Sequence, residues 1–219
     1  MRDALNATIH DVSTGFLRMQ SLTLEQLALV RQAVSGGSFA GLGRRVADLD
    51  RDIDELERGL EDACLNAIAR FQPLASDLRF LLAVFRSLAD VERVGDYNKH
   101  AGRDLEELSG SLRSGPLGDV LPLLALLSEM LERLAFAFAE RDLGATRDVM
   151  RLDDDVDALY EQLQRASLTR VLEDPRDLQA ALRVSRLARS LERLGDHAVN
   201  VAERIESWLS GRPQPERMG

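Results

Sequence analysis

The chain has 219 residues, of which 45% are hydrophobic and 30% charged, and its net charge at neutral pH is −9. This balance supports a packed core and argues against a disordered chain. The excess of acid argues against a nucleic-acid partner, and against attachment to an anionic membrane through charge alone.

Apolar residues recur every three or four positions along most of the chain, which is the spacing of amphipathic helices. No segment shows the alternation of a half-buried strand. Clusters of glycine and proline divide the pattern and predict six long helices, at residues 3–35, 39–71, 74–110, 116–140, 142–173 and 175–210. Ser38 and Asp174 are predicted N-caps, and Pro175 suits the first position of the last helix.

The N-terminal residues are polar and lack the apolar core of a signal peptide. The longest apolar stretch, residues 120–127, has about a third of the length that a membrane-spanning helix needs. We therefore expect a cytoplasmic protein without a membrane-inserted segment. Cys64 is the only cysteine, which excludes an internal disulfide, and its apolar helical setting predicts a small buried side chain.

The two halves of the chain resemble each other. Residues 49–54 recur 103 positions later as residues 152–157, and residues 88–96 recur 100 positions later as residues 188–196. Because both matches keep the same order, a tandem duplication is the simplest explanation. The sequence predicts an all-α fold of two antiparallel three-helix bundles, over residues 1–113 and 114–211, followed by a loose tail at 212–219.

The third predicted helix of each half carries acids on its apolar side. At about 100° per residue, Glu92 lies roughly 40° and Asp96 roughly 80° from the centre of the apolar arc. Glu192 and Asp196 take the same positions in the second half. A carboxylate that faces a core must be protonated, ion-paired or bound to a cation.

The second predicted helix of each half adds acids four residues apart, which places each pair on one helix face. These pairs are Asp50 with Asp54, and Asp153 with Asp157. Oxygen ligands of this kind suit hard divalent cations or iron. The chain is also rich in arginine, so interhelical arginine–carboxylate pairs explain the same pattern. Spacing alone leaves both interpretations open.

Other candidates for chemistry are sparse. His100 follows Asp96 by four residues, and Glu203 returns to the acidic face of the last helix, where its first-half counterpart is Arg103. The chain has no nucleophile elbow, phosphate loop or dinucleotide fingerprint, and it lacks the Glu-x-x-His pairs of di-iron bundles. The sequence therefore does not predict an enzyme.

Residues 72–79 followed by 90–96, together with residues 191–203, resemble the signature motifs of the PhoU family. The similarity extends from Leu17 to Ser210 and includes the duplicated Asp-x-x-x-Asp stretches. The resemblance implies two three-helix bundles and a negative regulator of phosphate uptake and of the phosphate regulon. It also implies a homodimer that connects PstB, the ATPase of the phosphate transporter, with the sensor histidine kinase PhoR.

The resemblance further implies carboxylate metal sites for iron, zinc, manganese or magnesium. The ligands that it assigns are Asp50, Asp54, Glu92, Asp96, Asp153, Asp157, Glu192, Asp196, Asn200 and Glu203. Residues 97–100 depart from the small and apolar residues that are usual after the first Gly-Asp, and Arg103 replaces an acid. We therefore expect the first-half site to differ in affinity or metal. A metal-storage protein or carboxylate-bridged metalloenzyme, and an adaptor whose acids pair with arginine, are the alternatives.

Overall fold

The computed structural model describes residues 1–108 and 115–212. The long helices in these ranges are α1 (Arg2–Gly36), α2 (Leu42–Phe71), α3 (Ser76–Leu108), α5 (Leu121–Glu140), α6 (Leu143–Glu173) and α7 (Leu178–Ser210). A four-residue helix α4 (Gly115–Gly118) and a 3-10 helix (Pro175–Asp177) complete the described elements, which include no strand. The predicted all-α class with six long helices is confirmed. No described helix has both the length and the apolar character that a membrane span requires.

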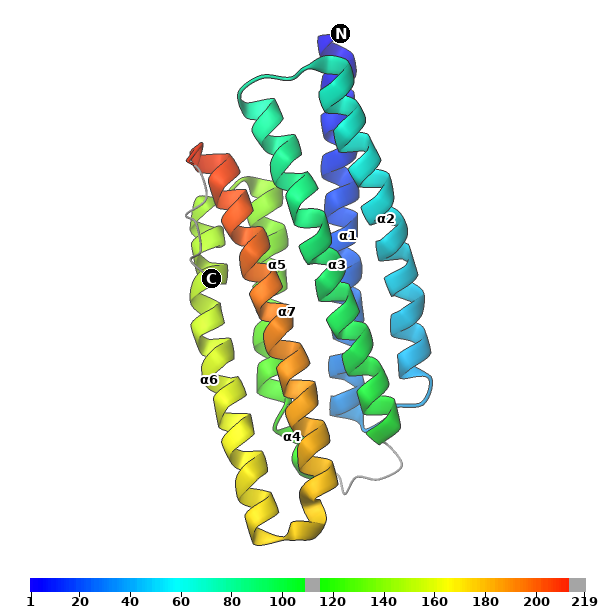
Figure 1. Ribbon diagram of the computed structural model, residues 1–219, viewed down its shortest axis with the longest axis vertical. Helices are drawn as coiled ribbons and strands as arrows, with labels where there is room; N and C mark the ends of the chain where they lie inside the picture. The colour runs from blue at the N-terminus through cyan, green and yellow to red at the C-terminus, as the bar shows by residue number, and fades with distance from the viewer. Residues whose placement is uncertain (109–114, 213–219) are drawn as a thin grey trace.

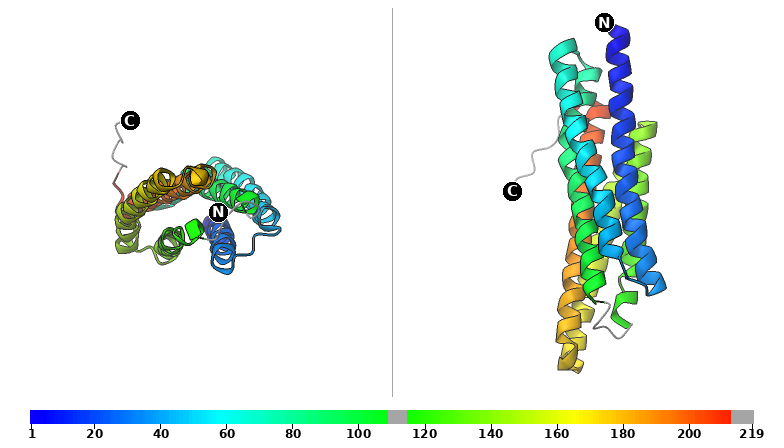
Figure 2. Two further views of the ribbon diagram at one scale, coloured as in Figure 1. Left: turned by 90° about the horizontal axis from the view of Figure 1, so that it is seen from below. Right: turned by 90° about the vertical axis from the view of Figure 1, so that its right-hand side faces the viewer.

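The two three-helix bundles lie side by side (Figure 1). Helices α1–α3 form the first repeat and α5–α7 the second. Seen along its length, the molecule has a curved layer of α6, α7, α3 and α2, with α5 and α1 on the concave side (Figure 2). The repeats meet where α3 packs on α7 and α1 packs on α5. The third helices of the two repeats, which carry the acidic motifs, are therefore neighbours.

One hydrophobic core runs through both repeats. Within it the ring of Phe138 on α5 lies 4.7 Å from the ring of Phe16 on α1 and 5.7 Å from that of Trp208 on α7. Phe80 on α3 lies 5.1 Å from Trp208. Each repeat thus uses the other to bury its apolar surface. The predicted boundary between residues 113 and 114, and residues 213–219 of the predicted tail, lie outside the described residues.

Several helix ends differ from the prediction. Helix α2 begins at Leu42 rather than at residue 39, because Gly41 adopts a left-handed conformation (φ 68°) and caps the helix in place of Ser38. Ala75 has φ 51°, so α3 begins at Ser76. The predicted helix at 116–140 is divided into α4 and α5, and Pro122 occupies the first turn of α5, where its missing N–H carries no penalty.

Both long helices of the α6–α7 hairpin are preceded by an aspartate cap, of which only Asp174 was predicted. Asp142 caps α6 by accepting hydrogen bonds from the backbone N–H of Gly144 (2.6 Å) and of Ala145 (3.2 Å). Asp174 accepts from the backbone N–H of Arg176 at 3.0 Å, as expected of a cap. However, the residues after Asp174 first form the 3-10 helix, and α7 begins only at Leu178. Cys64 is fully buried, and burial raises its pKa to about 11, which agrees with a packing role.

Candidate functional site

The predicted acids of the first repeat lie where α2 packs on α3, and those of the second lie where α6 packs on α7. A glycine on the third helix of each repeat allows a close approach. A Cβ atom added to Gly95 would lie 3.6 Å from Oδ1 of Asp50, and one added to Gly195 would lie 3.4 Å from Oδ1 of Asp153. Asp50 and Asp153 therefore occupy equivalent places, each against the neighbouring helix.

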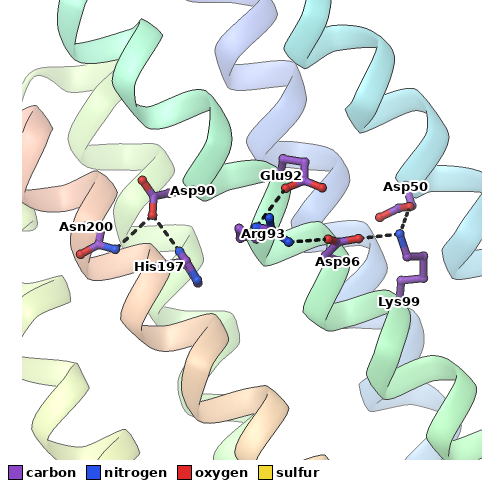
Figure 3. Close-up of polar contacts among 8 residues, drawn as sticks. All are labelled: Asp50, Asp90, Glu92, Arg93, Asp96, Lys99, His197 and Asn200. Carbon is purple, nitrogen blue, oxygen red and sulfur yellow. Dashed lines mark hydrogen bonds and ion pairs between the residues drawn. The ribbon is translucent and has the colours of Figure 1, made fainter.

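In the first repeat, Lys99 lies between carboxylates of two helices (Figure 3). Its Nζ atom donates to Oδ2 of Asp50 on α2 and to Oδ1 of Asp96 on α3, each at 2.5 Å. Burial lowers the pKa of Lys99, but the hydrogen bonds to the two carboxylates outweigh burial and raise that pKa. Lys99 is therefore an ammonium ion that joins α2 to α3.

Arg93 adds a second positive charge to the first repeat. Its Nη1 donates to Oδ2 of Asp96 at 3.3 Å, and its Nε lies 3.7 Å from Oε2 of Glu92 (Figure 3). Burial and the charge of Asp96 raise the pKa of Glu92 to about 7, despite Arg93. For Asp96, the hydrogen bond from Lys99 outweighs burial and lowers the pKa. Ion pairs with basic side chains thus describe Asp50, Glu92 and Asp96 of the first repeat, with burial still raising the pKa of Asp50 despite Lys99.

The second repeat has the same acids in a different electrostatic setting. In the described part of the chain, no basic nitrogen lies within 4.0 Å of a carboxylate oxygen of Asp157, Glu192 or Asp196. Burial and the charges of Asp196 and Asp157 raise the pKa of Glu192. Burial, Asp196 and two further acids raise the pKa of Asp157. These carboxylates repel one another, and a cation placed among them would relieve that repulsion.

The acidic side chains of the two repeats also differ in solvent exposure. Asp96 is half-buried, as its position at the edge of the apolar arc predicts, whereas Asp196 and Asp157 are exposed. The difference follows from the residue three positions after each aspartate on the third helix. The Lys99 side chain reaches Asp96, but Val199 is short and buried in the core. Asp157 and Asp196 are therefore open to ions from solvent, while Asp153 and Glu192 are half-buried.

The donor set of the second repeat fits a hard divalent cation or iron, because it offers oxygen ligands from two helices without a competing ammonium. The first repeat does not fit such an ion, since Lys99 already lies between Asp50 and Asp96. No group of three or more His, Cys, Asp or Glu side chains among residues 1–108 and 115–212 is arranged to hold a metal. Metal binding to the second repeat would thus require side-chain rotation.

A second polar cluster lies between the repeats, where α3 packs on α7. Oδ1 of Asp90 accepts hydrogen bonds from Nδ1 of His197 (2.7 Å) and Nδ2 of Asn200 (3.0 Å), as Figure 3 shows. The guanidinium of Arg204 pairs with Oδ2 of the same carboxylate. Burial raises the pKa of Asp90, but these three partners outweigh it and lower the pKa. We call Asp90, His197, Asn200 and Arg204 the inter-repeat cluster.

The remaining candidates have separate positions. Asn200, a predicted metal ligand, directs its amide group to Asp90 of the other repeat. Glu203 is half-buried on α7, and its counterpart Arg103 lines a groove with Asp50 and Lys99. His100 is exposed on α3. Tyr97 and His197, which are equivalent positions in the two repeats, stack with ring centres 5.6 Å apart where α3 packs on α7.

Two important residues were not assigned a role from the sequence. Lys99 is the only lysine of the chain and follows Asp96 by three residues, within ion-pairing reach on a helix, which is the sequence signal for its role. Asp90 belongs to the first-repeat motif at residues 90–96, and that motif does not by itself predict a site role for it. Comparison of the two repeats singles out Asp90, because the equivalent position in the second repeat is Ser190, which carries no charge.

Comparison with known proteins identifies relatives along nearly the whole chain. The family model described as the PhoU domain matches residues 16–105 and again residues 120–205. A phosphate-specific transport system accessory protein PhoU homolog from Deinococcus radiodurans is 42% identical over 96% of this chain and 99% of its own length. One of the same description from Pseudomonas aeruginosa is 34% identical over 94% of this chain and 85% of its own length. The crystal structure of PhoU from Pseudomonas aeruginosa matches with a TM-score of 0.89 at 31% identity, covering 94% of this chain and 99% of that one.

Proposed function

The chain belongs to the PhoU family, and from this membership we propose that it controls phosphate uptake as an adaptor between a phosphate transporter ATPase and a sensor histidine kinase. The observation that carries the proposal is the duplicated PhoU domain, which spans both repeats and is shared with accessory proteins of phosphate-specific transport. The proposed role is regulatory rather than catalytic. It is exerted in the cytoplasm by a homodimer.

We further propose that the second-repeat acids bind a divalent cation or iron. Asp153 and Asp157 of α6 and Glu192 and Asp196 of α7 would supply the oxygen ligands, with Glu203 as a further candidate. Support comes from the mutual repulsion of Asp157, Glu192 and Asp196 and from the exposure of Asp157 and Asp196. A bound cation would neutralise the repulsion and hold α6 against α7. Iron, zinc, manganese and magnesium are the ions to test.

Genetic complementation tests the proposed role. In the organism that carries the gene, its deletion is expected to raise phosphate uptake and phosphate-regulon expression in phosphate-rich medium. The wild-type gene should restore both. Unchanged uptake and expression in the deletion strain would contradict the proposal. Redox turnover or phosphoester hydrolysis by the purified protein, lost in Glu192→Gln, would instead favour a metalloenzyme.

The end of the α6–α7 hairpin is the surface that we propose for contact with a partner. Four leucines are exposed there: Leu168 by 63%, Leu172 by 77%, Leu178 by 44% and Leu182 by 56%. This end projects beyond the neighbouring helices at the lower end of Figure 1. Clustered exposed leucines are typical of protein-binding surfaces. The hairpin is held in shape by Gln164 and Ser185, whose side chains hydrogen bond at 2.5 Å across α6 and α7.

Leu172→Glu is expected to weaken binding to the transporter ATPase or to the kinase by about tenfold or more, because it places a charge in an apolar contact. The side chain is exposed, so the free energy of unfolding should change by less than about 0.5 kcal/mol. Leu65→Glu is the matched control, since Leu65 is a 51% exposed leucine on α2. Binding of each purified partner and thermal unfolding measure both effects. Equal binding losses in the two variants would contradict the placement of the surface.

A further inference from the structure

Lys99 lies at the centre of the first-repeat acids. Its Nζ atom is 2.5 Å from a carboxylate oxygen of Asp50 and 2.5 Å from one of Asp96, and its side chain is 17% exposed. The two carboxylates come from different helices, so the ammonium bridges α2 and α3 (Figure 3). These contacts make Lys99 the cation that this carboxylate pair binds.

The position of the ammonium is the position that a shared metal ion would need. Metal–oxygen distances of hard divalent cations are about 2.0–2.6 Å, a range that includes the 2.5 Å contacts of Lys99. A metal ion that joined Asp50 to Asp96 would therefore meet the ammonium at short range. Two cations so close repel strongly in a partly buried setting. Occupancy by Lys99 and occupancy by a metal are thus mutually exclusive.

The second repeat lacks this internal cation. The position equivalent to Lys99 is Val199, which is apolar and only 4% exposed. Two further equivalent positions change sign in the same direction, because Arg51 corresponds to Asp154 and Arg103 to Glu203. Arg51, Lys99 and Arg103 line one groove beside Asp50. Asp48 lines the same groove and corresponds to Arg151, so the charges at positions 48 and 51 are exchanged between the repeats and the net difference lies at Lys99 and Arg103.

We propose that Lys99 permanently replaces a metal ion in the first repeat, so that this chain binds metal through the second repeat alone. The two repeats then respond differently to metal supply. The acids of α2 and α3 are bridged by an ammonium that chelators cannot remove, whereas an ion bound among the acids of α6 and α7 would be removed by a chelator, leaving contacts such as the Gln164–Ser185 hydrogen bond in place. This inference deepens the proposed metal function, but the experiment below separates the failure of one from the failure of the other.

Lys99→Val is the decisive variant, because it gives the first repeat the residue that the second repeat has. After reconstitution with iron, zinc, manganese or magnesium, elemental analysis of this variant is expected to show about twice the metal content of the wild type. Lys99→Arg, which keeps a cation, should show no gain. Adding Glu92→Gln and Asp96→Asn to Lys99→Val should remove the gained metal. Thermal unfolding confirms that each variant is folded, and Lys99→Met serves as a second neutral variant.

Each outcome decides between the two hypotheses. Metal gained by Lys99→Val and by Lys99→Met, on top of a wild-type content that Glu192→Gln/Asp196→Asn abolishes, supports both. Metal gained by the Lys99 variants when the wild type binds none supports the role of Lys99 and overturns the second-repeat metal site. No gain in folded Lys99 variants overturns the role of Lys99. Wild-type metal that is lost in Glu92→Gln/Asp96→Asn overturns it as well.

Hydrogen exchange provides a readout that does not count metal. Chelation of the loaded wild-type protein is expected to speed exchange in α6 and α7 and to leave α2 and α3 unchanged. In loaded Lys99→Val, chelation should speed exchange in α2 and α3 also. A wild-type protein whose α2 and α3 respond to chelator would overturn the proposal.

Discussion

Replacement of Asp90 by alanine is expected to lower the free energy of unfolding by about 2–3 kcal/mol and the melting temperature by roughly 5–10 °C. Alanine removes the acceptor that His197, Asn200 and Arg204 share, and leaves those groups partly buried between α3 and α7. The Arg204 and His197 side chains are 21% and 24% exposed, so water replaces part of the lost contacts. Denaturant unfolding of the full chain measures the effect.

The dependence of the unfolding free energy on pH in the acid range gives an independent test of the role of Asp90. Its three partners outweigh burial and lower the pKa of the carboxylate. A lowered pKa stabilises the fold at pH values above the unfolded-state pKa of about 3.9, and this contribution is lost as the pH falls through the folded-state pKa. The difference in unfolding free energy between wild type and Asp90→Asn should therefore be present above about pH 4 and shrink below it.

Asp104 offers a matched control at the opposite end of the same helix pair. Its carboxylate lies 3.7 Å from Nε of Arg186, whose side chain is 61% exposed. Burial raises the pKa of Asp104 despite Arg186, so its effect on stability has the opposite pH dependence. Asp104→Ala is expected to cost less than about 1 kcal/mol. Equal losses at the two positions would contradict a special role for the inter-repeat cluster in joining the repeats.

The helices and their duplication could be predicted because both are local properties of the sequence. Apolar spacing located six long helices, and the repeat offsets correctly paired Asp50 with Asp153 as equivalent positions against α3 and α7. Helix starts were less predictable, because they depend on single backbone conformations. The left-handed Gly41 delays α2 in this way. A turn divides residues 116–140 into α4 and α5. The apolar pattern continues through this turn and therefore does not predict it.

The state of the acids could not be predicted, because it depends on which side chain reaches them in space. Angular positions on a helix are the same for Glu92 and Glu192, yet Lys99 reaches Asp96 in the first repeat, while in the second repeat Arg193 and Arg189 only partly offset the repulsion of Glu192 by Asp196 and Asp157. The partners of Asp90 come from α7, more than 100 residues away in the chain. Helical spacing within a single segment gives no information about such a contact.

The exchange of Glu192 for glutamine together with Asp196 for asparagine is expected to abolish metal binding by the wild-type chain. Both changes keep the side-chain size and remove two of the charged oxygen ligands on α7, so the affinity should fall by about 100-fold or more. Elemental analysis after reconstitution and dialysis measures the loss. The same variant is expected to fold at least as well without metal, because burial and neighbouring acids raise the pKa of Glu192 and thus disfavour its charged form at neutral pH.

The matched control is the equivalent pair in the first repeat, Glu92→Gln/Asp96→Asn. Lys99 already neutralises Asp96 there, so metal content should stay at the wild-type value while stability falls through loss of the Lys99 and Arg93 contacts. The two double variants are therefore expected to have opposite effects. The second-repeat variant loses metal and keeps its stability, whereas the first-repeat variant keeps its metal and loses stability. Undiminished metal in Glu192→Gln/Asp196→Asn would contradict the second-repeat site. In that case the acids of α6 and α7 would form a solvated charged surface, and regulation by this chain would depend on protein contacts alone.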